Sequence, residues 1–496
     1  MKASLLHLIA VVSLLLPLPA GAAKRNIILF VTDDQSPDTG AYGNAVIKTP
    51  NLDALAADGT LFTQAFATTA SCSASRSVIL SGLHNHANGQ YGHQHDFHKF
   101  ASWENVQSLP VLLARHGYRT AQIGKYHVAP ESTYHFETYL KGNARNAPQM
   151  AERCKEVIDS DDERPFFLYF ATSDPHRGGG VDKTSKLPDK PDLFGNLPKR
   201  GSHEGVEEVF YSPADVIVPK FLPDTPSCRE EIAQYYQSIS RIDQGLGRLV
   251  QLLKAAGKYE ETLIVFTADH GMAFPGGKTT VYEGGLRVPF IVHNPDVEQR
   301  GVRSDAMISH VDITPSLLDY AGAWDAKARG PLEKLMRPVA RTRDNQGSLQ
   351  KSLHGRSWLD TLSKPHSDGW DAINASHTFH EIQMYYPMRV VRDRKFKLIW
   401  NIAYPLPYPF ASDLWAAATW QAQWKLGKDA PYGTKTVGEY IQRPQFELYD
   451  IENDPDEAHN LAEETSYAET LEAYKSKLKQ FQKDTGDRWI IKWEYE

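Results

Sequence analysis

Residues 25–34 read RNIILFVTDD, an apolar run that ends in two adjacent aspartates. A short continuous apolar run is typical of a strand that is buried on both faces of a parallel sheet. Similar runs recur at residues 119–123, 165–171 and 262–267. Helical patterns lie between them, at residues 51–57, 106–116, 147–158 and 230–256. Strands that alternate with helices predict an α/β fold, in which a large, mainly parallel sheet is flanked by helices.

The pattern of the chain changes towards its C-terminal end. Residues 388–402 (MRVVRDRKFKLIWNI) alternate like two antiparallel strands around a charged turn, and residues 446–451 resemble a further short strand. Residues 469–482 have the pattern of a terminal helix. We therefore expect a large domain at residues 23–370 and a smaller α+β domain with an antiparallel sheet at residues 371–496.

The composition restricts the class of partner. The chain has 496 residues and a formal net charge of −7 at pH 7. Nucleic acids recruit basic surfaces, so this charge argues against nucleic acid as a general partner. A small basic pocket for an anionic substrate remains compatible with it, because the local field decides what binds. The oligomeric state is left open, and a homodimer is one arrangement that the sequence allows.

The first 22 residues have the pattern of a cleavable signal peptide. Lys2 gives a positive start, residues 5–18 are mostly apolar, and residues 20–22 (AGA) are small. This apolar run is shorter than the roughly 20 residues that a membrane-spanning helix needs. We therefore expect export to a periplasm or out of the cell, without a membrane anchor.

The chain has three cysteines, Cys72, Cys154 and Cys228. The sequence leaves open whether Cys154 and Cys228 form a disulfide. Such a disulfide would leave Cys72 without a partner cysteine. Cys72 begins the segment CSASR, which precedes a helical apolar run at residues 78–80. A helix N-terminus favours anions, and Arg76 lies one turn further on the same face. A small buried cysteine beside a surface arginine is the alternative that this segment alone leaves open.

Acidic residues follow two of the predicted strands. Asp33 and Asp34 end the first strand, and Asp269 and His270 follow the strand at residues 262–267. Adjacent carboxylates repel each other unless donors or a cation compensate, although solvated surface pairs are common. Because the carboxyl ends of parallel strands meet at one edge of a sheet, the two groups could share one ion. Carboxylate oxygens are ligands that suit Ca²⁺.

Basic residues follow other strands at the same edge. A single lysine or histidine at such a position is more commonly a solvated side chain than a site residue. Together, three loops bring two lysines and two histidines towards the acidic edge: Lys125, His127, His176 and Lys278. A separate histidine-rich stretch contains His84, His86, His93, His95 and His98. Its spacing matches no structural zinc pattern, so we expect some of these side chains to be solvated and others to line a polar pocket.

The segment at residues 72–76 (CSASR) resembles the signature of the sulfatase family, which is cysteine or serine, any residue, proline or alanine, any residue, arginine. Within this family, the chain is similar to the sulfamidases, or heparan N-sulfatases, over nearly the whole mature length. The similar segments are residues 89–100 (GQYGHQHDFHKF), 124–130 (GKYHVAP), 174–177 (DPHR) and 216–226 (VIVPKFLPDTP), with His380-Glu381 and residues 386–389 (YPMR). The resemblance implies the fold of the alkaline-phosphatase superfamily, with residues 23–370 as the catalytic domain.

The resemblance also implies the chemistry. In this family the cysteine is oxidised to formylglycine by a maturation enzyme, which assigns the nucleophile to Cys72. Ala74 stands where proline is commoner, so the sequence leaves open which maturation enzyme acts. The implied Ca²⁺ ligands are Asp33, Asp34, Asp269 and His270. Arg76, Lys125 and Lys278 are implied to balance negative charge, His176 to protonate the leaving group, and His127 to help deprotonate a hydroxyl.

The implied substrate is the N-sulfate of glucosamine in heparan-derived saccharides. The implied substrate-binding residues are Asp96, His98, His380, Glu381 and Arg389. The last three could instead tie the two domains together. Three other functions stay open from the sequence. They are an O-sulfatase acting on the same sugars, a phosphodiesterase or phosphonate hydrolase, and a non-catalytic sulfated-glycan-binding protein in which Cys72 remains a thiol.

Overall fold

The computed structural model describes residues 25–178, 194–196, 202–324 and 353–495. The signal peptide predicted at residues 1–22 lies outside these ranges. Within them, no helix combines the length and the apolar character that crossing a membrane requires.

The large sheet has eight strands in the order β4-β3-β5-β1-β6-β7-β2-β8. Their bounds are β1 Asn26–Thr32, β2 Thr60–Phe66, β3 Arg119–Gly124, β4 Thr138–Leu140, β5 Phe166–Ala171, β6 Thr262–Ala268, β7 Phe290–His293 and β8 Val302–Ser309. β7 runs antiparallel to both of its neighbours, while the other strand pairs are parallel. The sheet is therefore mixed and mainly parallel, as predicted, and the four predicted strands are β1, β3, β5 and β6.

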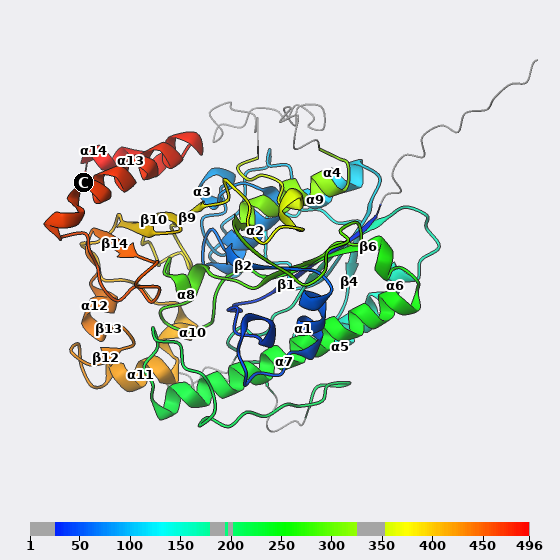
Figure 1. Cartoon of the computed structure of the whole chain (residues 1–496), viewed down its shortest axis with the longest axis horizontal. Helices are drawn as coiled ribbons and strands as arrows, with labels where there is room; N and C mark the ends of the chain where they lie inside the picture. Colours follow the sequence, from blue (N-terminus) through cyan, green and yellow to red (C-terminus); the bar gives the residue numbers. More distant parts are fainter. Residues whose placement is uncertain (1–24, 179–193, 197–201, 325–352, 496) are drawn as a thin grey trace, which may run out of the picture.

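Helices cover both faces of this sheet (Figure 1). Their bounds are α1 Pro50–Ala57, α2 Cys72–Ser81, α3 Asn85–Asn88, α4 Leu109–Arg115, α5 Ala147–Arg153, α6 Lys155–Ile158, α7 Pro226–Ala255, α8 Glu283–Leu286 and α9 Ile313–Tyr320. β1 is buried throughout and alternates between the two layers. Leu29 packs with α2, α4 and α9 on one face, and Phe30 packs with α1, α5 and α7 on the other.

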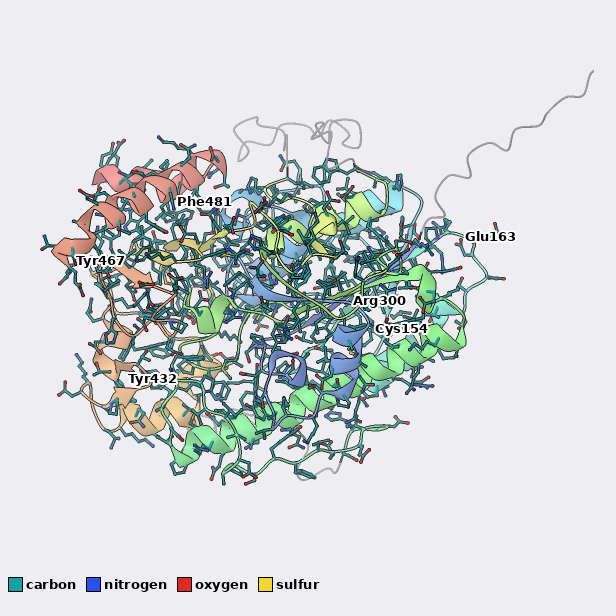
Figure 2. The ribbon with its side chains drawn as sticks, in the orientation of Figure 1. Cys154, Glu163, Arg300, Tyr432, Tyr467 and Phe481 are labelled. Atoms are coloured by element: carbon teal, nitrogen blue, oxygen red, sulfur yellow. The ribbon has the colours of Figure 1, made fainter. Side chains whose placement is uncertain are left out.

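Two predicted helices differ in their bounds. The helix predicted at residues 147–158 is divided at Cys154 into α5 and α6. The helix predicted at residues 230–256 begins at Pro226, because Thr225 caps α7 and proline suits a first turn. Cys154 (labelled in Figure 2) and Cys228 are buried and unpaired. Cys72 is unpaired as well, so none of the three cysteines, all within the described ranges, forms a disulfide.

The second sheet has four antiparallel strands in the order β14-β11-β10-β9. Their bounds are β9 Ala372–His377, β10 Met388–Asp393, β11 Phe396–Asn401 and β14 Phe446–Asp450. The remaining elements are α10 Ser412–Trp415, α11 Ala418–Trp424, β12 Pro431–Tyr432, β13 Lys435–Thr436, α12 Val437–Ile441, α13 Ala468–Asp484 and α14 Lys492–Tyr495. Leu478 of α13 packs against Leu398 of β11. The predicted antiparallel sheet and terminal helix are confirmed, whereas β9 was not predicted.

The register of the central strands places their carboxyl ends next to one another, at the same edge of the sheet. Thr32 pairs with Ala268, and Val31 pairs with Ala171. Just beyond these pairs, the Asp269 backbone N–H donates to the Thr32 carbonyl at 2.9 Å. The residues that follow β1, β5 and β6 are therefore adjacent, which brings the polar groups predicted from the sequence to a single edge.

Candidate active site

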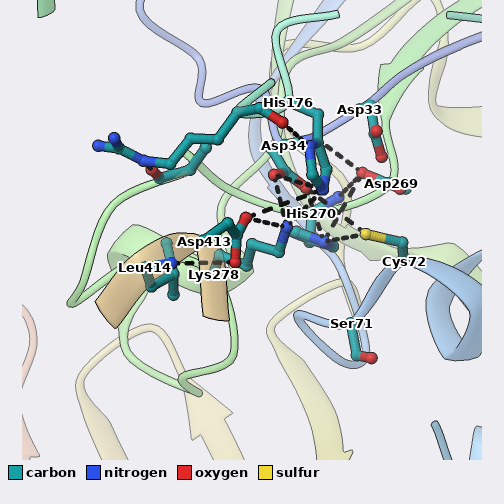
Figure 3. Close-up of polar contacts among 12 residues, drawn as sticks. Asp33, Asp34, Ser71, Cys72, His176, Asp269, His270, Lys278, Asp413 and Leu414 are labelled. Carbon is teal, nitrogen blue, oxygen red and sulfur yellow. Dashed lines mark hydrogen bonds and ion pairs between the residues drawn. The ribbon is translucent and has the colours of Figure 1, made fainter. Parts of the chain in front are cut away.

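The polar residues that follow the strands converge on the first turn of α2 (Figure 3). Cys72 is the first residue of this helix and is fully buried. Its Sγ lies 3.4 Å from His270 Nε2 and 3.7 Å from Asp34 Oδ1. Cys72 is thus in direct contact with residues from the ends of β1 and β6.

The Cys72 thiol is not activated as a thiolate. Burial raises its pKa well above the usual value, and the carboxylates of Asp33 and Asp34 add to the increase. These effects outweigh the opposing effect of Lys125 and Lys278 on the pKa. Since the thiolate is the nucleophilic form, an unmodified Cys72 is a poor nucleophile at neutral pH.

Arg76 holds the two acidic loops together. Its side chain is fully buried, with Nε 3.0 Å from Asp269 Oδ2 and Nη2 3.1 Å from Asp33 Oδ1. Burial alone would raise the pKa of Asp33, but Lys125 and the other neighbouring cations hold it well below the usual value. Burial raises the pKa of Asp269 to about 6, although Arg76 opposes the increase. The crowded carboxylates therefore favour an additional cation nearby.

The same residues offer ligands for a metal ion. Ligand atoms of Asp34, Cys72, Asp269 and His270 all lie within 4.8 Å of one another. His270 Nδ1 is 3.0 Å from the Gly271 carbonyl oxygen. A proton on Nδ1 leaves the lone pair of Nε2 directed at the acidic group. Carboxylates match Ca²⁺, while an imidazole nitrogen suits transition metals better. The donor set fits a divalent cation.

Lys278 links this acidic group to the open pocket. Its Nζ lies 3.0 Å from Asp34 Oδ2, 2.8 Å from His176 Nε2 and 2.9 Å from Asp413 Oδ2. Burial, together with Lys278, lowers the pKa of His176 to about 4. In the free protein at neutral pH, His176 is therefore an uncharged acceptor of a hydrogen bond from Lys278.

Asp413 was not predicted as a site residue. It lies on α10, about 135 residues beyond Lys278, in a segment with no recognisable motif. Burial would raise its pKa, but Lys278 and His176 lower the pKa below the usual value. Its position is set by the packing of the C-terminal part of the chain on the large sheet, which local sequence patterns do not report.

A pocket of about 480 Å³ opens above this group. Its lining includes seven of the residues expected from the sequence: Asp33, Lys125, His127, His176, Lys278, His380 and Glu381. The other expected catalytic and metal-binding residues are buried in contact with these: Asp34, Cys72, Arg76, Asp269 and His270. The lining also includes residues that were not assigned a site role: His93, Gln94, His95, Arg145, Ser173, Ser412 and Asp413.

The expected substrate-binding residues are divided between several places. His380 is buried, with Nε2 2.8 Å from His93 Nε2, and Glu381 accepts a hydrogen bond from Ser412 Oγ at 3.1 Å. Asp96 is exposed and does not line the pocket. His98 is buried behind the lining, where its Nδ1 accepts a hydrogen bond from the Ile382 backbone N–H.

The assignment of Arg389 to substrate binding is corrected by the structure. Arg389 is fully buried on β10 and does not line the pocket. Its Nε and Nη2 donate to the two carboxylate oxygens of Asp487, at 2.5 and 3.0 Å. The arginine therefore ties the second sheet to the segment after α13, and both partners lie within residues 371–496. This contact is neither the substrate contact nor the link between the two predicted domains that the sequence left open.

We expect Arg389→Ala to lower the free energy of unfolding by about 3–5 kcal/mol, because it leaves the buried Asp487 carboxylate unpaired. Chemical denaturation measures this change, and KM of the folded variant should stay close to that of the wild type. The pKa of Asp487 is held below its usual value, mainly by Arg389 acting against burial. The stabilisation is therefore complete above the unfolded-state pKa of about 3.9 and is lost as the pH falls below it. A KM that rises strongly without a loss of stability would support a substrate contact instead.

Two site residues adopt a backbone conformation that L-amino acids rarely take. Asp34 has φ 60° and His127 has φ 54°. Each such residue costs roughly 1–3 kcal/mol unless its surroundings enforce it, and such residues cluster at functional sites. The left-handed backbone conformation of Asp34 and His127 is therefore consistent with a functional role for both residues.

The site combines a potential nucleophile at a helix N-terminus, an acidic group that fits a cation, and two pocket lysines. This combination is typical of a hydrolase that acts on an anionic group. The sequence profile of the family described as Sulfatase matches residues 25–323. The chain belongs to the sulfatase family, whose members hydrolyse sulfate esters or sulfamates.

Individual relatives refine this assignment. Human N-sulphoglucosamine sulphohydrolase is 37% identical over 481 residues, which cover 95% of this chain and 92% of that protein. The chain is thus a sulfamidase-like member of the family. An N-acetylglucosamine-6-O-sulfatase of Bacteroides thetaiotaomicron is 24% identical over 556 residues, covering 94% of this chain and 87% of that protein.

Solved structures agree in fold. One, of a protein in complex with its substrate D-glucosamine-2-N,6-O-disulfate, matches with a TM-score of 0.63 and 20% identity, covering 94% of this chain and 99% of that chain. The phosphonate monoester hydrolase of Agrobacterium radiobacter matches with a TM-score of 0.62 and 21% identity, covering 93% and 96%. At these identities the matches establish the fold and not the substrate.

Proposed function

We propose that the protein is an exported sulfatase that removes the N-sulfate from glucosamine in heparan- or heparin-derived saccharides. The observation that carries this proposal is the 37% identity with human N-sulphoglucosamine sulphohydrolase over nearly the full length of both chains. A relative named for O-sulfate removal is less similar, at 24% identity. Export follows from the signal peptide predicted at residues 1–22.

The proposed nucleophile is the hydrate of formylglycine, made from Cys72 by a maturation enzyme. The neutral, buried thiol supports this step, because the unmodified side chain is poorly suited to attack. After conversion, oxygen occupies the region of Sγ, close to His270 Nε2 and Asp34 Oδ1. One hydroxyl of the hydrate attacks sulfur, and the other remains for the second step.

Asp33, Asp34, Asp269 and His270 would hold the divalent cation, which we propose to be Ca²⁺. When bound, the cation supplies positive charge that polarises the sulfate and favours loss of a proton from the nucleophile. The charges of the residues in direct contact support this arrangement. Four carboxylates, Asp413 included, contact three cations, Arg76, Lys125 and Lys278. A divalent cation together with a singly charged sulfate group would bring this set to neutrality.

His176 is proposed to protonate the nitrogen of the leaving amine. In the free protein it accepts a hydrogen bond from Lys278, so its proton must come after the substrate binds. A sulfate group beside Lys278 and His176 would favour the protonated histidine, because a nearby negative charge raises the pKa. Once the amine has left, His127 helps to remove a proton from the second hydroxyl. Sulfate then departs, and the aldehyde is regenerated.

An O-sulfatase acting on the same sugars is the second candidate. The Bacteroides 6-O-sulfatase relative favours it, since that relative also aligns over most of this chain. Both candidates use the same residues below the pocket. They differ in how the sugar is placed above them, where Glu381, Ser412 and Asp413 provide polar groups.

We expect N-sulfoglucosamine to be hydrolysed at least about 100-fold faster than the 6-O-sulfate or the 3-O-sulfate of glucosamine, measured as kcat/KM. A pocket whose buried polar groups match one position of the sulfate leaves them unpaired when the sugar is shifted. Release of free sulfate from each isomer at equal concentration measures the preference. Faster release from an O-sulfated isomer would identify the second candidate and leave the family assignment intact.

A further inference from the structure

Three histidines face one another in the pocket, beside the carboxylate group that would hold Ca²⁺. One ring nitrogen from each of His93, His95 and His127 lies within 4.8 Å of the other two. We propose that these three imidazoles form a second metal site, which takes a transition metal such as Zn²⁺ and, when occupied, blocks the pocket.

The three rings come from two separate loops. His93 and His95 follow α3, and His127 follows β3. His95 Nδ1 lies 2.7 Å from His127 Nε2, and the ring centroid of His93 is 4.8 Å from that of His95 and 4.9 Å from that of His127. Zn²⁺ binds imidazole nitrogen at about 2.0–2.1 Å, so small side-chain rotations would place an ion among the three.

The backbone and the neighbouring side chains fix two of the three rings. The His93 N–H donates to the His380 carbonyl at 2.9 Å, and its ring nitrogens contact Ser73 Oγ and His380 Nε2. A metal on His93 would replace one of these ring contacts. His127 is held in a left-handed conformation. His95 is the most exposed of the three, so its side chain has room to adjust.

All three imidazoles are available as neutral ligands. Burial lowers the pKa of His93 and His127 well below the usual value, and it lowers the pKa of His95 as well. Lys125 contributes to each decrease. A neutral imidazole keeps the lone pair that a metal requires, so no proton must be displaced at neutral pH. The same lysine repels a dication, so we expect the metal to exchange with solution instead of remaining permanently bound.

The donor type separates this site from the carboxylate site. Three nitrogen ligands suit Zn²⁺, whereas Ca²⁺ requires oxygen ligands. The two sites should therefore discriminate between the two ions. Because His93, His95 and His127 line the same pocket as Asp33, Lys125 and Lys278, a bound Zn²⁺ would occupy space that a substrate needs.

The test is a titration of the full-length, calcium-loaded protein with Zn²⁺, followed by calorimetry. Co²⁺ serves as a spectroscopic probe, since nitrogen ligation at low coordination number gives strong visible absorption. We expect one additional equivalent of Zn²⁺ that excess Ca²⁺ does not displace. His95→Ala should weaken this binding at least about 10-fold. His366→Ala is the matched control, because His366 is also partly exposed but contacts Asp305 elsewhere on the surface.

Two results would contradict the proposed zinc site. One is the absence of any additional Zn²⁺ binding. The other is Zn²⁺ binding that His95→Ala leaves unchanged and that Asp34→Asn or excess Ca²⁺ removes, which would assign the ion to the carboxylate group. Both readouts measure metal binding without substrate. They therefore remain informative whichever sulfate ester or sulfamate the enzyme hydrolyses.

Discussion

Cys72→Ala is expected to lower kcat by roughly 10⁴-fold or more, because it removes the side chain from which the nucleophile is made. The fold should survive the change. Cys72 is a small buried residue whose Sγ has polar neighbours, and alanine fits the first turn of α2 without altering the backbone. The loss of one buried sulfur atom should cost only on the order of 1 kcal/mol of stability.

Cys154→Ala provides the matched control for this variant. Cys154 is likewise buried and unpaired, but it packs in the helical layer on the far face of the sheet, between α5 and α6. Its replacement should change turnover little. Rates of desulfation for the two variants, with circular dichroism to confirm folding, separate the chemical role from a general effect of removing a cysteine. Substantial turnover by Cys72→Ala would refute a nucleophile at this position.

Asp33→Asn is expected to reduce kcat/KM by about 10³-fold, because it weakens the cation site and also removes the charged partner of Lys125 and one of the two carboxylates that contact Arg76. Asp33 contacts both the buried Arg76 and the pocket residue Lys125, so the loss of its charge affects both of these side chains. Excess Ca²⁺ should restore part of the activity. Chelation of the wild-type protein should abolish turnover, and added Ca²⁺ should restore it.

Asp243→Asn is the control for a buried carboxylate away from this site. Asp243 accepts hydrogen bonds from the side chain and backbone of Asn51, and burial raises its pKa to about 6. The variant should retain the calcium dependence of the wild type. Full activity of Asp33→Asn, or of a fully chelated protein, would contradict the proposed cation.

Much of the large sheet was predictable because its central strands are uniformly apolar. β1 and β6 each consist of seven buried residues, and their sequences match the pattern of a strand covered on both faces. β2, β4, β7 and β8 were not predicted. β7 has only four residues, and β8 (VRSDAMIS) mixes polar with apolar side chains, so their pairing depends on the neighbouring strands.

The convergence of the candidate site residues was predictable where they directly follow a strand. Asp33 and Lys125 lie at such positions, and the common direction of β1 and β3 brings them together. Asp413 and the grouping of His93 with His127 could not be inferred, because both depend on how loops from distant parts of the chain pack. For Arg389, the sequence predicted a substrate contact that the structure does not show. Its surrounding segment resembles that of sulfamidases, yet its side chain points into the interior.

The central claim is that turnover depends on conversion of Cys72. Mass spectrometry of the peptide that contains residue 72, in preparations made with and without a co-expressed maturation enzyme, tests it most directly when the rate of each preparation is measured in parallel. The account predicts that the aldehyde or its hydrate is present and that kcat rises in proportion to the converted fraction from a zero intercept. A preparation that contains only the unmodified thiol and still desulfates N-sulfoglucosamine at the full rate would contradict it.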